Sequence, residues 1–143
     1  MYNRILLATD GSEHADEAAS HAIYTAGRED ADLHVLFVAE KTRDDPETTG
    51  LQEGVSENLN RGDEIIADVK GKADERGVEV VSETVVGHPK ETIREYADEK
   101  TVDLIVMGSV GKSGVKRVAL GSVAEDVIRS ASIPVLTVRN SER

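Results

Sequence analysis

Short apolar runs alternate along this chain with longer segments of helical periodicity. The apolar run 5–8 (ILLA) is followed by a segment, 12–28, in which alanines and Ile23 recur on one side. The same alternation continues to the C-terminal apolar run 134–138. Strands that alternate with amphipathic helices are typical of βαβ units, whose strands are parallel.

This pattern predicts five strands and four helices in one domain, residues 1–143. The strands are expected at 5–8, 33–38, 78–86, 104–107 and 134–138, and the helices at 12–28, at 55–76, from Pro89 onward, and at 122–130. The polar stretch of about 40–54 contains two glycines and is expected to be a mobile loop. Right-handed crossovers then favour an α/β fold, a doubly wound open parallel five-stranded sheet with the Rossmann-like order 3-2-1-4-5.

Composition narrows the range of partners. The 143 residues include 17 Lys+Arg and 28 Asp+Glu, a formal net charge of -11, so neither nucleic acid nor a membrane surface is an expected partner. There is no cysteine, which excludes thiolate metal sites and cysteine nucleophiles. No signal peptide or membrane span is apparent, so we expect a cytoplasmic protein. The acidity suits either an ordinary solvated surface or adaptation to high salt.

The residues that could bind a ligand come directly after the fourth predicted strand. Glycines 108, 111, 114 and 121 lie between this strand and the last helix, where backbone N–H groups can approach a ligand closely. From Leu104 to Ala124 there is no Asp or Glu, although the stretch contains Lys112, Lys116 and Arg117. Ser122 stands where the last helix begins, beside unpaired amides of its first turn. Together these features predict a phosphate-binding loop.

Other interpretations of the same residues remain. Ser122-Val123-Ala124-Glu125 fits a capping box, which would stabilise the helix start without a ligand. Asp10, after the first strand, could contact a ligand or simply close an Asx turn. Two familiar phosphate motifs are absent: a P-loop would need glycine where Val106 stands, and no G-x-G-x-x-G fingerprint follows a strand.

The chain resembles the universal stress protein family. The resemblance rests on the spacing Gly108-x-x-Gly111, nine residues, then Gly121-Ser122, on the early stretch 8–12 (ATDGS), and on the closing stretch 133–138 (IPVLTV). The motif G-2x-G-9x-G-[ST] marks the ATP-binding branch of that family. One departure is Ala8, where many members have valine or proline.

The resemblance implies a binding site for ATP, with Mg. Contact with adenine and ribose is implied for Ala8, Thr9, Asp10, Val38 and Met107, and contact with the phosphates and ribose for Gly108, Gly111, Lys112, Ser113, Gly114, Gly121, Ser122 and Val123. It also implies a homodimer through the last strand, 134–139. No catalytic residue and no metal-ligating side chain is assigned.

The predicted function is that of an ATP-binding regulatory or stress-response protein. ATP is expected to order the loop 108–121 and so change the surface that a regulatory protein partner meets. No side chain of the motif is an obvious general base, so enzymatic activity is at most slow ATP hydrolysis or autophosphorylation. The alternative is a dimeric interaction module that holds no nucleotide.

Overall fold

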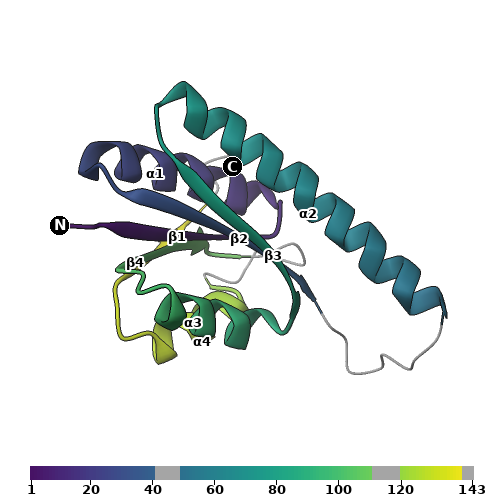
Figure 1. Cartoon of the computed structure of the whole chain (residues 1–143). Coiled ribbons are helices and arrows are strands. Elements are labelled where there is room, and N and C mark those ends of the chain that lie inside the picture. The colour runs from purple at the N-terminus through teal and green to yellow at the C-terminus, as the bar shows by residue number, and fades with distance from the viewer. Residues whose placement is uncertain (41–48, 111–119, 140–143) are drawn as a thin grey trace.

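The computed structural model describes residues 1–40, 49–110 and 120–139, with the side chains of the second helix from Glu57 onward. The elements are β1 (Arg4–Thr9), α1 (Glu13–Glu29), β2 (Asp32–Glu40), α2 (Thr49–Glu75), β3 (Val80–Gly87), α3 (Pro89–Glu99), β4 (Leu104–Gly108), α4 (Ser122–Ser130) and β5 (Val135–Val138). The strands form one parallel sheet in the order β3-β2-β1-β4-β5, which confirms the predicted fold class and strand order. Helices α1 and α2 cover one face and α3 and α4 the other (Figure 1).

The three inner strands, β2, β1 and β4, carry the core because both of their faces are covered. In β1, Ile5 and Leu7 pack under α1 and α2, whereas Leu6 and Ala8 face α3 and α4. The three larger side chains are fully buried, and burying each contributes about 1.5 to 3 kcal/mol. The continuous apolar run of β4 is explained in the same way, since alternate residues face opposite layers.

Helix α2 begins earlier than the sequence pattern predicts. The expected loop 40–54 is wrong for 49–54, which belong to the helix that starts at Thr49; positions 41–48 lie outside the described residues. Gly50 and Gly54 each disfavour helix by about 1 kcal/mol, but adding residues to a formed helix is far easier than nucleating one. Packing of the second half of α2 against the sheet therefore lets the helix extend through both glycines.

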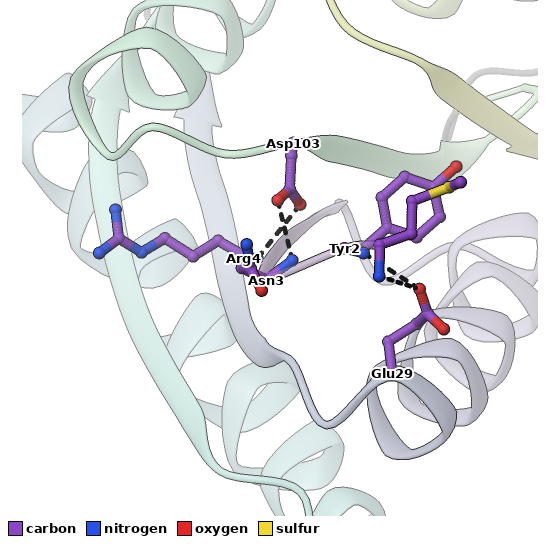
Figure 2. A network of polar contacts seen from close by, with 6 residues as sticks. Tyr2, Asn3, Arg4, Glu29 and Asp103 are labelled. Atoms are coloured by element: carbon purple, nitrogen blue, oxygen red, sulfur yellow. Dashed lines mark hydrogen bonds and ion pairs between the residues drawn. The ribbon is translucent and has the colours of Figure 1, made fainter.

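The amino end of the sheet is held by two carboxylates (Figure 2). Asp103 accepts hydrogen bonds from the backbone N–H groups of Asn3, at 2.8 Å, and Arg4, at 3.1 Å. Glu29 of α1 accepts from the N–H of Tyr2 at 3.0 Å and pairs with the N-terminal ammonium of Met1 at 3.2 Å. The hydrogen bond from Tyr2 is the main cause that lowers the pKa of Glu29. These contacts tie β1 to α1 and β4 at the end opposite the carboxyl ends of the strands.

A buried polar pair joins β2 to α3. The Nδ1 atom of His34 lies 2.9 Å from the hydroxyl oxygen of Tyr96, and the two rings meet edge to face. Burial lowers the pKa of His34 and raises the pKa of Tyr96. His34 thus has a structural role, since it joins β2 to α3.

Candidate functional site

The carboxyl ends of β1 and β4 define the point where the sheet changes direction. Ala8 of β1 is in register with Met107 of β4, and the chain leaves β1 toward α1 on one face but reaches α4, after β4, on the other. In open parallel sheets, ligands bind beside such a switch point. Of the predicted site residues, Ala8, Thr9 and Asp10 lie at the end of β1, and Met107 and Gly108 at the end of β4.

The turn after β1 is held by its own side chains. The N–H of Gly11 donates to the Thr9 hydroxyl at 3.2 Å, and the N–H of Ser12 donates to Oδ1 of Asp10 at 2.9 Å. Gly11 has a φ of 79°, which glycine adopts without strain. Ser12 then caps α1 by accepting from the N–H of Ala15 at 3.2 Å. The Asx turn expected as one interpretation of Asp10 is confirmed, and its contact with a ligand stays a prediction.

Gly108 is required by the packing of the protein itself. A Cβ atom at this position would stand 2.8 Å from the Cβ of His14 and 3.0 Å from the backbone nitrogen of Ala15. The end of β4 can therefore approach the first turn of α1 only if residue 108 has no side chain. This is a reason for the first glycine of the motif that the sequence pattern did not reveal.

The glycine-rich loop is tied at its base. The N–H of Ser109 donates to the carbonyl of Val138 at 2.8 Å, and the N–H of Gly121 donates to the carbonyl of Ser109 at 2.6 Å. Among the buried polar side chains of the described residues, only the Ser109 hydroxyl has no hydrogen-bond partner. Four predicted site residues lie outside the described residues: Gly111, Lys112, Ser113 and Gly114.

The start of α4 differs from the capping box considered above. Gly121, with φ -74° and ψ 165°, is the N-cap and supplies no side-chain hydrogen bond. Ser122 is already the first helical residue, so its hydroxyl is one position too late to cap. Glu125 instead pairs with Arg129 at 2.8 Å. The capping box is therefore wrong, and the amides of 122–124 have no acceptor within the part of the chain that the structure describes.

An apolar platform lies at the same strand ends. Ala8 and Met107 are buried members of the apolar cluster on the α3 and α4 face, and Val38 and Val123 pack against it partly exposed. These four predicted site residues come from β1, β4, β2 and α4, so the fold brings them into one cluster. Val123 belongs to the start of α4, so this cluster lies beside the amides of 122–124, which have no acceptor among the described residues.

One cation near the site was not expected from the sequence. The guanidinium of Arg61, from α2, lies beside the turn after β1, with Nη2 3.5 Å from the position of a Cβ at Gly11. Nothing in the local sequence of α2 signals this placement, because it depends on how α2 crosses the sheet.

The residues that the structure describes show neither a metal-binding cluster nor a membrane-spanning helix. They contain no group of three or more His, Cys, Asp or Glu side chains arranged to hold a metal ion. None of their helices is long and apolar enough to span a bilayer.

The fold defines the chain as a doubly wound parallel α/β protein of Rossmann-like strand order. The model of the universal stress protein family matches residues 1–139, and the chain belongs to this family. It is 41% identical over 148 aligned residues to universal stress protein MJ0531 of Methanocaldococcus jannaschii, covering 100% of this chain and 85% of that protein.

Two solved structures extend the comparison. The structure of MJ0577, a universal stress protein of the same organism, superposes with a TM-score of 0.83 at 32% identity, covering 100% of this chain and 99% of that one. A universal stress protein in complex with cAMP superposes with a TM-score of 0.74 at 27% identity, covering 98% of this chain and 99% of that one. The likeness therefore spans the whole fold, including the strand ends described above.

Proposed function

We propose that this universal stress protein binds ATP at the carboxyl ends of β1 and β4 and acts as a nucleotide-dependent regulatory protein of the stress response. The observation that carries the proposal is the start of α4, whose first-turn amides are left without a side-chain cap at the end of the G-2x-G-9x-G-S loop. An anion there gains hydrogen bonds and a favourable interaction with the helix dipole. The cAMP complex of a 27% identical family member supports an adenine nucleotide as the ligand.

The apolar platform would receive the base. In this proposal adenine packs on Ala8, Val38 and Met107, with Thr9 and Asp10 near the ribose. Oδ1 of Asp10 already accepts from Ser12, so the Asx turn holds the carboxylate in place for a ribose hydroxyl. The phosphates would meet the loop 108–114 and the start of α4, Gly121 to Val123.

Mg²⁺ would enter with ATP, carried on its phosphates. The described side chains offer no metal cluster, so binding of the ion alone is not expected. Because the proposed ligand is a cytoplasmic metabolite, we place the protein in the cytoplasm.

The site can be tested by a substitution that separates binding from folding. Ser122 is exposed in the first turn of α4, so Ser122→Glu adds a carboxylate where the helix dipole favours one, by about 0.3 to 1 kcal/mol, yet repels a phosphate. We expect an unchanged or higher melting temperature without nucleotide and at least about tenfold weaker MgATP binding in calorimetry. The matched control is Ser20→Glu, the same charge change at an exposed position of α1.

Adding MgATP to the nucleotide-free wild type tests whether the protein binds ATP at all. MgATP at about 100 times its dissociation constant should stabilise the fold by roughly 2.7 kcal/mol. No change in melting temperature at millimolar MgATP would overturn the proposal and leave the nucleotide-free interaction module. Release of ADP above the rate of the Ser122→Glu variant would instead add slow hydrolysis to the function.

The exposed edge of β5 favours a dimer, whether the protein binds ATP or acts as a nucleotide-free interaction module. β5 lies at a sheet edge, and Leu136 in this strand is 39% exposed. We propose that two copies pair through the strand 134–139 and cover this side chain. Native mass spectrometry of freshly purified protein measures the stoichiometry and any retained nucleotide together, and a monomer at micromolar concentration would contradict the dimer.

A further inference from the structure

Ser109 combines deep burial with an unpaired hydroxyl. The residue is 1% exposed, and its hydroxyl has no hydrogen-bond partner within the part of the chain that the structure describes. Buried polar groups in folded proteins nearly always have a partner, because an unpaired group loses its hydration and gains nothing in return. The hydroxyl therefore destabilises the nucleotide-free fold, and Ser109 directly follows β4, where the proposed site lies.

The hydrogen bonds of the sheet show which way the Ser109 side chain points. The N–H groups of Ile105 and Ser109 both donate to carbonyls of 134–138, so the two residues have the same orientation in the ladder. Ile105 and Met107 face α3 and α4, whereas a Cβ at Gly108 would meet the first turn of α1. Because successive side chains alternate between the faces of a sheet, the Ser109 hydroxyl faces the layer that contains α4.

The backbone of Ser109 is held on both sides. Its N–H donates to the carbonyl of Val138 at 2.8 Å, and its carbonyl accepts from the N–H of Gly121, the N-cap of α4, at 2.6 Å. With both backbone groups bonded, rotation about the Cα–Cβ bond is the main freedom left to the side chain. The hydroxyl is thereby kept close to the residue where α4 begins.

The start of α4 offers further donors at the same place. The amides of 122–124 have no acceptor among the described residues, and Gly121 supplies no side-chain cap. Glu125, the acidic residue of this first turn, pairs with Arg129 at 2.8 Å. From 104 to 124 the sequence contains no Asp or Glu. A phosphate, with several acceptor oxygens, can accept from the amides and from a hydroxyl together, and hydrogen bonds to a charged acceptor are the stronger kind.

We infer that Ser109 is a further binding residue, whose hydroxyl donates a hydrogen bond to the phosphate held at the start of α4. This inference rests on the proposed function and adds to it a residue that neither the glycine spacing nor the family resemblance assigned. Because the hydroxyl is enclosed, a phosphate oxygen reaches it only in a second conformer, in which the groups that cover it have moved. The unpaired hydroxyl disfavours the nucleotide-free conformer, so Ser109 shifts the balance toward the conformer that binds phosphate.

Ser109→Ala tests the inference through two effects of opposite sign. Without nucleotide the variant loses an unpaired buried hydroxyl, so its melting temperature should rise by at least about 2 °C. In calorimetry it should bind MgATP at least about fivefold more weakly than the wild type. Adenosine carries no phosphate and should bind both proteins equally. A hydroxyl that only held the fold together would lower the melting temperature when removed.

Two other variants control for size and for place. Ser109→Cys nearly keeps the size of the side chain but has only a weak donor, so it should lose MgATP affinity as Ser109→Ala does. It also serves if Ser109→Ala does not fold. Ser130→Ala removes an exposed hydroxyl at the other end of α4, where it donates to the carbonyl of Asp126 at 2.9 Å. That control should bind MgATP as the wild type does and gain no stability.

Three results would overturn the inference. They are equal MgATP affinity of the wild type and Ser109→Ala, a lower melting temperature of nucleotide-free Ser109→Ala, and an equal loss of affinity for adenosine and MgATP. Magnesium tripolyphosphate, which has phosphates but no base, separates this inference from the proposed function. If the wild type binds tripolyphosphate more tightly than Ser109→Ala but does not bind MgATP, the inference stands and the nucleotide function falls. If the wild type binds neither, both fall.

Discussion

The N–H of Gly121 donates to the carbonyl oxygen of Ser109 at 2.6 Å, so the residue before α4 is joined to the residue after β4. Ser109 is itself joined through its N–H to Val138 at the end of β5. The two ends of the glycine-rich loop are thereby held together whatever the loop contains. This bond sets where the uncapped start of α4 lies relative to the strand ends.

Removing that hydrogen bond should displace the proposed phosphate site. Gly121 has a φ of -74°, which proline also adopts, but the proline ring takes the place of the N–H hydrogen, so Gly121→Pro deletes the donor and also pushes the Ser109 carbonyl away. Compared with Gly121→Ala, which keeps the donor, we expect the free energy of unfolding in urea to fall by at least about 1 kcal/mol and MgATP binding in calorimetry to weaken. Equal values for the two variants would show that the bond contributes nothing.

A methyl group at Gly108 should force β4 away from α1. The nearest atoms, in His14 and Ala15, belong to the first turn of α1 and include backbone, which cannot rotate aside. Gly108→Ala is expected to lower the free energy of unfolding by about 1 to 3 kcal/mol in urea titration. Gly71→Ala is the control, since no atom lies within 4 Å of its added Cβ, and in a helix it should stabilise by roughly 0.5 to 1 kcal/mol.

His34 should make the fold sensitive to mild acid. Burial lowers its pKa in the folded state below the ordinary value near 6.5. Above about pH 6.5 the ring is neutral in both states and adds no pH dependence. As the pH falls from there toward the lowered pKa, the unfolded state takes up the proton and the folded state does not, so stability is lost, by up to about 1.4 kcal/mol per pH unit.

Urea titrations at pH 7.5 and 5.5 measure this loss, with His34→Gln as the comparison. The variant lacks the buried imidazole and keeps every other titratable group of the chain, so its pH dependence is the reference for the wild type. The stability difference between the two pH values should be larger in the wild type than in His34→Gln. A parallel decline of both proteins would exclude the histidine as a cause.

The acidic surface predicts stabilisation by salt. At a formal net charge of -11, self-repulsion favours the expanded chain, and counterions screen it over about 10 Å at 0.1 M salt. The melting temperature should therefore rise as KCl increases toward molar concentration. A melting temperature that stays flat or falls would contradict adaptation to high salt; the same titration with sorbitol controls for general solute effects.

Most of the fold was predictable because its signals are local. The period of apolar residues identified each strand and helix, and Pro89 marked the first turn of α3, as the structure confirms. The predicted boundaries were wrong where a neighbouring element decides them. β3 runs to Gly87 rather than ending at residue 86, because Gly87 pairs with Glu40.

The sequence nominated residues for the candidate site but did not show their contacts. Sequence placed Ala8, Val38 and Met107 near one another through the family resemblance, and the fold brings them to one apolar cluster. It could not show that Gly108 makes room for His14, nor that Arg61 reaches the turn after β1. Those contacts join residues that are far apart along the chain, and no periodic pattern in the sequence relates them.

Sequence alone therefore determined the class of fold, the order of its elements and the position of the glycine-rich loop, since each depends on patterns within about twenty residues. Tertiary structure decided that Gly121 rather than Ser122 caps α4, that Arg61 reaches the turn after β1, and that β3 has an open edge beside a groove. The physical reason is that caps, long-range contacts and grooves depend on distances of a few ångströms between atoms. Packing of the whole chain sets those distances, and no local pattern encodes them.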